Sequence, residues 1–287
     1  MAASAARNLS PFGEEVELSE VPAEGSDEAE LLRELFHRDG LLFVRGLQLD
    51  HDQQIAFCRL FGPVPDSPFE NFVISNVDKG GYLGKRELHW HNDVPFLPKP
   101  YLYAALHALA VDPQAVPTRF VSAYRGYERL PTRLRQRIEG MKALHVRERV
   151  YDRPTRMTDL VEGDICTVHD IVRTDPVSGR KFLFVNQAWT AQVIGLSQAD
   201  GDALLEEIFS YFYVDDDIYE HKWREGDLVL WDNIAVQHSR GLAGEGRRTL
   251  QRVTVTEYGY EEQYPSDVAA ISSELGNETM LEPEAAG

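Results

Sequence analysis

The spacing of apolar residues along the chain predicts four helical regions. Near the start, large apolar residues recur at helical spacing, at Leu31, Leu32, Leu35 and Phe36. Asp39-Gly40 follows them, and glycine is common just beyond a helix, so this helix is expected over about 27–38. The other helices are expected at about 50–61, within 122–141 as two short segments separated by Pro131, and at 197–213.

Most other ordered segments are predicted to be strands. Apolar or alternating runs fall at 41–44, 101–111, 181–185, 227–231 and 249–258. Residues 147–166 show no periodicity, which is typical of a loop. Because strands dominate the middle and the end of the chain, we expect a mainly β fold with helical additions. An antiparallel sheet or barrel suits this pattern better than a doubly wound parallel sheet.

Composition narrows the class of protein. The 287 residues are 43% hydrophobic and 26% charged, which are the values of a globular chain, so a disordered protein is excluded. No apolar run approaches the roughly 20 residues that span a bilayer, and the first residues lack the apolar core of a signal peptide. Two cysteines are too few for a disulfide framework. We therefore expect a cytoplasmic protein with no membrane partner.

The formal net charge is −18, and most of it lies at the two ends of the chain. Residues 1–30 and residues 261–287 each carry a net charge of −7. Acidic ends are usually solvated, so we expect an acidic segment at 1–26, one domain at 27–260 and an acidic tail at 261–287. The chain also lacks the basic stripe that a nucleic-acid groove requires, so no nucleic-acid partner is expected. Homo-oligomerisation is left open by the sequence.

Candidate chemistry gathers around Leu88-His-Trp-His-Asn-Asp-Val-Pro95. Side chains two residues apart on a strand point to the same face, so His91 and Asp93 can offer a nitrogen and an oxygen together. His238, far along the chain, can supply a third ligand. Two histidines and one carboxylate leave positions open on an octahedral ion, an arrangement that favours Fe(II) acting with oxygen and an organic co-substrate.

A histidine followed two residues later by an aspartate is also common by chance. The chain has a second example, His37-Arg-Asp39, but it falls at a predicted helix end, where side chains two apart do not face each other. Arg248 and Arg252 distinguish the first pair, because both share one face of the last predicted strand with apolar Leu250. Buried guanidinium groups need anionic partners, so the residues indicate a metal site with one or two anion anchors. A cluster of surface arginines is the alternative.

Further matches to a known family occur in order along the chain: Trp90-His-Asn-Asp93, Thr118, Trp231-Asp-Asn233 through Gln237-His238, and Arg247-Arg248 with Arg252. With these segments the chain resembles, over roughly residues 30–258, the Fe(II)- and 2-oxoglutarate-dependent dioxygenases of the taurine and 2,4-dichlorophenoxyacetate dioxygenase (TauD/TfdA) family. The resemblance implies a double-stranded β-helix, or jelly-roll, core.

The same resemblance implies His91, Asp93 and His238 as iron ligands, with Arg248 and Thr118 binding the distal carboxylate of 2-oxoglutarate. It implies Fe(II) as cofactor and 2-oxoglutarate and O2 as co-substrates. The implied reaction couples decarboxylation of 2-oxoglutarate to succinate and CO2 with hydroxylation or desaturation of a small organic substrate. We expect that substrate to be anionic, such as an amino acid or a biosynthetic intermediate.

Two residue roles and two other functions stay open. Arg252 can hold either the C1 carboxylate of 2-oxoglutarate or an anionic group of the substrate. His89 lies on the same face as His91 by alternation and is a candidate for substrate contact or for support of that ligand. The other functions are a jelly-roll hydrolase or isomerase with zinc or another divalent ion, and a family member that binds 2-oxoglutarate without catalysis. The hydrolase or isomerase would leave Arg248 and Thr118 unexplained. A family member without catalysis would be expected to lack a metal ligand, and none of the three is lost. The oxygenase is therefore preferred.

Overall fold

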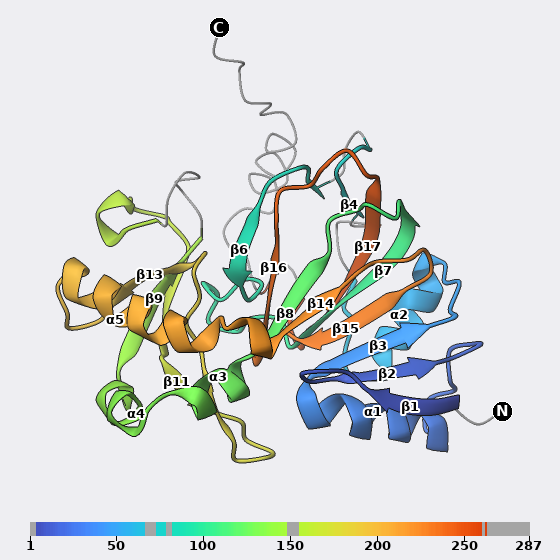
Figure 1. The fold of residues 1–287 in the computed structure, drawn as a ribbon, viewed down its shortest axis with the longest axis horizontal. Helices are drawn as coiled ribbons and strands as arrows, with labels where there is room; N and C mark the ends of the chain where they lie inside the picture. Colours follow the sequence, from blue (N-terminus) through green and yellow to red (C-terminus); the bar gives the residue numbers. More distant parts are fainter. Residues whose placement is uncertain (1–3, 67–72, 79–81, 148–154, 260–261, 263–287) are drawn as a thin grey trace, which may run out of the picture.

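The computed structural model describes residues 4–262 apart from 67–72, 79–81, 148–154 and 260–261. Within these residues, two sheets form the core of the protein (Figure 1). The larger sheet has the order β1 (Ser4–Asn8), β2 (Glu14–Glu17), β3 (Leu41–Arg45), β15 (Leu228–Asp232), β7 (Tyr103–Val111), β17 (Arg248–Val255), β4 (Val73–Ser75) and β5 (Tyr82–Leu83). The smaller sheet has the order β14 (Ile218–His221), β8 (Thr118–Ser122), β16 (Val236–Arg240) and β6 (Leu88–His91).

The two sheets pack face to face over a shared apolar core. Phe43, Leu106 and Leu250 come from the larger sheet, and Phe120 and Val236 come from the smaller one. All five belong to one buried cluster, and neighbouring strands such as β15 and β7 pair antiparallel. This arrangement is a double-stranded β-helix, or jelly-roll, core, which confirms the predicted fold class.

Helices α1 (Asp27–Asp39) and α2 (His51–Arg59) cover the outer face of the larger sheet. Phe36 and Phe57 pack there against strand residues such as Val253. The Ser26 side chain accepts a hydrogen bond from the backbone of Ala29 at the start of α1, and the helix ends at Gly40, whose φ of 71° is left-handed. The predicted helix over 27–38 is therefore confirmed, stop signal included.

The segment between β8 and β14 forms a separate lobe, at the left of Figure 1. Its helices are α3 (Ala123–Arg129), α4 (Thr132–Ile138) and α5 (Gln198–Phe212), with 3-10 turns at Met157–Asp159 and Asp215–Asp217. Its strands are β9 (Lys142–Val146), β10 (Cys166–Asp170), β11 (Val172–Thr174), β12 (Lys181–Leu183) and β13 (Thr190–Val193). Its sheets have the orders β10-β9-β13 and β11-β12. The predicted helices at 122–141 and 197–213 are confirmed, whereas part of the loop predicted at 147–166 lies outside the described residues.

The expectation that the acidic N-terminal end is solvated is wrong for much of residues 4–26. Strand β2 pairs parallel with β3 and buries Val16. Glu14, only 2% exposed, pairs with Arg38 at 3.0 Å. Apolar alternation and ion pairing thus outweigh the negative charge of the segment. Nearly all of the tail predicted at 261–287 lies outside the described residues, and so the domain limits stay predictions.

No helix in the described part of the chain has the length and the apolar character needed to cross a membrane.

Candidate metal centre

Two histidines meet because neighbouring strands of the smaller sheet place them opposite each other. His91 is the last residue of β6, and the antiparallel register pairs it with His238 on β16. Their ring centroids lie 4.1 Å apart. Residues directly opposite on an antiparallel pair have side chains on the same face, so both imidazoles point to one place. Strand pairing therefore brings together two histidines that lie far apart in the sequence.

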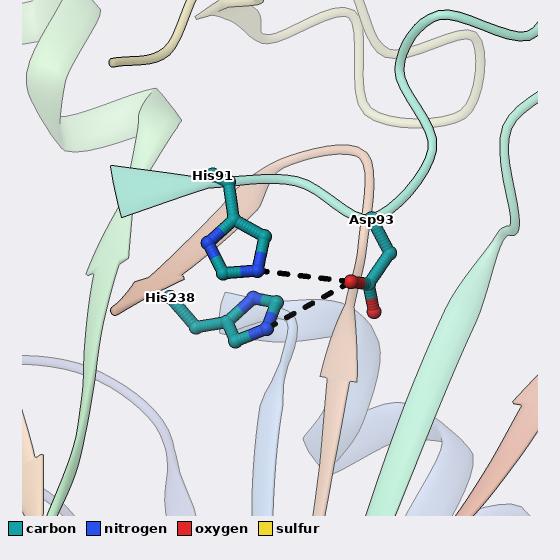
Figure 2. A group of neighbouring side chains, drawn as sticks. All are labelled: His91, Asp93 and His238. Carbon is teal, nitrogen blue, oxygen red and sulfur yellow. Dashed lines mark ion pairs between the residues drawn. The ribbon is translucent and has the colours of Figure 1, made fainter. Parts of the chain in front are cut away.

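Asp93 completes the group, but not by the strand alternation expected from the sequence. Strand β6 ends at His91, and Asp93 lies in the following bend. The next residue, Val94, has a φ of 49°, a strained conformation for a β-branched residue that turns the chain sharply. Oδ1 of Asp93 lies 3.8 Å from Nε2 of His91 and 4.0 Å from Nε2 of His238. Figure 2 shows the carboxylate turned toward both rings.

The buried Asn233 side chain holds this bend, a role that sequence reasoning missed. Its Oδ1 accepts a hydrogen bond from the Asp93 backbone N–H at 2.7 Å, and its Nδ2 donates to the Asp93 carbonyl at 2.9 Å. The neighbouring Asn92 side chain donates to the Asn233 carbonyl at 2.7 Å. Asn233 stands in the matched segment Trp231-Asp-Asn233, but sequence alone does not reveal that its amide clasps both backbone groups of Asp93.

The candidate ligand side chains are in the protonation states that metal binding requires. Burial holds the pKa of His238 well below its ordinary value and also lowers the pKa of His91, so both rings are neutral near pH 7. Burial opposes ionisation of Asp93, but the positive charge of Arg252 is the largest influence in the other direction, and the pKa of that carboxyl is lowered. Neutral imidazole and ionised carboxylate are the ligand forms that bind divalent metals.

Main-chain and side-chain neighbours orient two of these ligands. Nδ1 of His91 lies 2.7 Å from the carbonyl oxygen of His89, to which it donates, so that Nε2 faces the other two side chains. The His89 side chain itself is exposed, and only its carbonyl joins the site. Nη2 of Arg252 lies 3.0 Å from Oδ2 of Asp93, which leaves Oδ1 directed at the histidines.

Thr118 and Arg248 form a second polar pair in the same interior. Phe120 lies in the core between the sheets and pairs with His238, so Thr118, two residues earlier on β8, faces that interior as well. Arg248 stands two residues before the core residue Leu250 on β17. Nη2 of Arg248 donates to Oγ1 of Thr118 at 2.8 Å.

The surroundings of Arg248 suit an anion. Arg248 is 3% exposed, and burial, together with the charge of Arg240, lowers its pKa to about 9. In the described part of the chain no carboxylate pairs with Arg248, and its Nε has no hydrogen-bond partner. A guanidinium left in this state is costly unless a ligand neutralises it. A carboxylate fits its planar donors.

The structure thus brings together the predicted residues in two groups. His91, Asp93 and His238 each offer a ligand atom, all within 4.8 Å of one another, and Arg252 contacts Asp93. Thr118 and Arg248 are bonded to each other. Nitrogen and carboxylate donors fit a first-row divalent metal, and the buried Arg248 fits an anionic co-substrate, so the residues suit iron and 2-oxoglutarate.

Comparison with known proteins identifies the class. Residues 5–254 match the family described as "Taurine catabolism dioxygenase TauD, TfdA family". An α-ketoglutarate-dependent 2,4-dichlorophenoxyacetate dioxygenase of Cupriavidus pinatubonensis is 34% identical, covering 84% of this chain and 92% of that protein. A pentalenolactone F synthase of Streptomyces avermitilis is 29% identical, covering 76% and 82%. The crystal structure of AAD-2 with Mn(II) and N-oxalylglycine has a TM-score of 0.75 at 23% identity, covering 89% of this chain and 98% of that one.

The chain belongs to the TauD/TfdA family. It is an oxygenase that depends on Fe(II) and 2-oxoglutarate, uses O2 as its second co-substrate and acts on a small organic molecule. The enzyme class, the fold and the cofactors predicted from the sequence are confirmed. The roles of individual residues remain predictions.

Proposed function

We propose that His91, Asp93 and His238 bind the iron, that Thr118 and Arg248 hold the distal carboxylate of 2-oxoglutarate, and that the enzyme hydroxylates or desaturates a small anionic substrate. The observation that carries this proposal is the meeting of three metal-ligand side chains, within 4.8 Å, in the same interior as a buried arginine for which the described residues supply no anion. A hydrolase or isomerase would leave that arginine without a purpose.

Each side chain has a separate task in this proposal. His91, held through Nδ1 by the His89 carbonyl, presents Nε2, and Arg252 keeps one oxygen of Asp93 turned to the metal. Bound iron supplies oxygen activation coupled to decarboxylation of 2-oxoglutarate. The apolar core residues Phe120 and Trp231, whose rings lie 6.3 and 4.9 Å from that of His238, exclude water from one side of the ligands.

Arg252 is placed to contact a second anionic group beside the metal ligands. Besides pairing with Asp93 at 3.0 Å, this guanidinium lies 5.6 Å from the ring of Tyr101, so a positive charge stands directly beside the candidate metal ligands. It is therefore our candidate for a second anion, either the C1 carboxylate of 2-oxoglutarate or an acidic group of the substrate. The relative named for 2,4-dichlorophenoxyacetate, a carboxylate, supports an anionic substrate. We assign the His89 side chain no substrate contact, because it is exposed.

The proposal concerns a small-molecule enzyme. Its net charge of −18 argues against a nucleic-acid partner, and no membrane contact is needed for the chemistry. A cytoplasmic location suits both expectations, and self-association stays open.

A succinate-release screen tests the proposal. Purified enzyme with Fe(II), 2-oxoglutarate and oxygen is assayed against carboxylates, amino acids, sulfonates and sulfate esters, with His238→Ala as the matched inactive control. We expect one or more anionic compounds to raise succinate release well above the substrate-free rate, and neutral analogues to have no effect. Metal-dependent hydrolysis without oxygen uptake would support the hydrolase instead, and 2-oxoglutarate binding without succinate would support a silent binder.

A further inference from the structure

Trp223 contacts both residues that are proposed to bind the distal carboxylate of 2-oxoglutarate, Thr118 and Arg248. It follows β14, whose last residue, His221, pairs with Thr118 on β8. The indole Nε1 of Trp223 donates to Oγ1 of Thr118 at 2.9 Å, and Arg248 donates to the same oxygen at 2.8 Å. All three side chains are buried, with 5%, 2% and 3% of the surfaces of Trp223, Thr118 and Arg248 exposed.

The hydrogen-bonding capacity of a hydroxyl group fixes what Thr118 can do next. A hydroxyl accepts two hydrogen bonds and donates one. Indole and guanidinium groups can only donate, so Trp223 and Arg248 use both acceptor positions of Thr118. The hydroxyl proton must then point elsewhere, and among the described residues no acceptor is hydrogen-bonded to it. A buried hydroxyl donor therefore lies beside a buried guanidinium Nε that equally has no partner within those residues.

Packing keeps Trp223 in this orientation. Its ring makes an edge contact with the ring of His221 at 4.5 Å, and Nε2 of His221 lies 3.2 Å from the Asp227 carboxylate. The Arg248 guanidinium carbon lies 5.7 Å from the indole centroid, within the range of a cation–π contact. One tryptophan thus contacts both members of the anion site.

We propose that Trp223 is a positioning residue for 2-oxoglutarate: by donating to Thr118 it forces that hydroxyl to act as a donor toward the distal carboxylate of the co-substrate. This inference rests on the proposed function, in which Thr118 and Arg248 bind that carboxylate. Without the indole N–H, the hydroxyl can rotate and present a lone pair to the carboxylate, which repels it. The enzyme would then lose affinity for 2-oxoglutarate without losing affinity for metal.

A double-mutant cycle tests this role without turnover. The four proteins are wild type, Trp223→Phe, Thr118→Val and the double variant, each loaded with Mn(II). Binding of N-oxalylglycine, a dicarboxylate analogue of 2-oxoglutarate, is measured by calorimetry, and Mn(II) binding is measured separately. Trp223→Phe should weaken N-oxalylglycine about 3- to 10-fold in the wild-type background, the effect of one neutral hydrogen bond, and leave Mn(II) affinity unchanged. In the Thr118→Val background it should have no further effect.

The outcomes separate this inference from the proposed function. The positioning role is refuted if the Trp223→Phe variant binds N-oxalylglycine as tightly as wild type does. It is also refuted if the substitution weakens N-oxalylglycine binding equally with and without the Thr118 hydroxyl. Neither result counts against the anion site itself. If Thr118→Val also binds normally, the proposed contact of Thr118 with the distal carboxylate is refuted as well, and the Arg248→Lys titration decides whether the arginine binds it alone. Should Trp223→Phe unfold, site-specific replacement of Trp223 by benzothienylalanine, which has the shape of tryptophan but no N–H, gives the same comparison.

Discussion

Arg248→Lys is the substitution for which the structure predicts the clearest loss. The lysine keeps a positive charge, but it has a single nitrogen. That nitrogen cannot replace both Nη2 of Arg248, which donates to Thr118, and Nε, which has no partner among the described residues and is available to a ligand. A hydrogen bond to a charged group contributes about 1.5–3 kcal/mol, so losing one from a 3% exposed site should weaken 2-oxoglutarate binding by roughly 10- to 100-fold.

The assay is an anaerobic titration of the Fe(II)-loaded protein with 2-oxoglutarate, which needs no knowledge of the primary substrate. Arg247→Lys is the matched control, because the neighbouring side chain is half-exposed and lies 3.4 Å from Asp78 at the surface. Its dissociation constant should change by no more than about twofold. An Arg248→Lys dissociation constant equal to that of wild type would refute the assignment of this arginine as the anchor.

Three further changes test the surroundings of the site and the stability of the fold. Asn233→Asp removes the amide that donates to the Asp93 carbonyl, so Fe(II) affinity should fall about 10-fold in a competition titration; unchanged affinity would disprove this support. Burial, aided by His169, lowers the pKa of His145 to about 3, so its stabilisation is complete above the unfolded pKa near 6.5 and is lost as pH falls below that value. Between pH 7.5 and 5.5 the free energy of unfolding measured with urea should fall by about 1.4 kcal/mol less in His145→Gln than in wild type. An equal fall in both proteins would contradict this role of His145. Asp217→Asn weakens ion pairs to two arginines on α3 at 2.6 Å each and should lower the free energy of unfolding by about 1–3 kcal/mol, whereas no change in denaturation midpoint would count against those pairs.

Local pattern was enough for the elements whose signals are short-range. The helix at Asp27–Asp39 has amphipathic spacing, a capping Ser26 and a terminating Gly40 within one segment of sequence. The strand at Tyr103–Val111 is a long, mainly apolar run, and residues 104–108 are buried on both faces. In each case the residues that decide the structure are neighbours in the chain, so one sequence contains the whole signal.

Elements that depend on distant partners escaped prediction. Strand β2 pairs with β3 and β1 pairs with β2, and the glutamates of β2 concealed its buried Val16. Strands β9, β10 and β13 are four or five residues long and owe their conformation to one another. Tertiary pairing outweighs local preference in such short segments.

The candidate site shows the same division. The meeting of the candidate ligands His91, Asp93 and His238 could be predicted because each stands in a recognisable motif, although Asp93 reaches the group through a strained turn rather than strand alternation. Trp223 could not be predicted, because it contacts Thr118 across 105 residues of sequence, and no motif links the two.

The most direct measurement is the visible absorption of the protein under anaerobic conditions as Fe(II) and then 2-oxoglutarate are added. A weak charge-transfer band that appears only with both, saturates at one iron per chain and disappears in both His238→Ala and Asp93→Ala is the predicted result. A band that persists unchanged in those two variants, or no band at all in wild type that binds both components, would contradict the assignment of these side chains as the iron site.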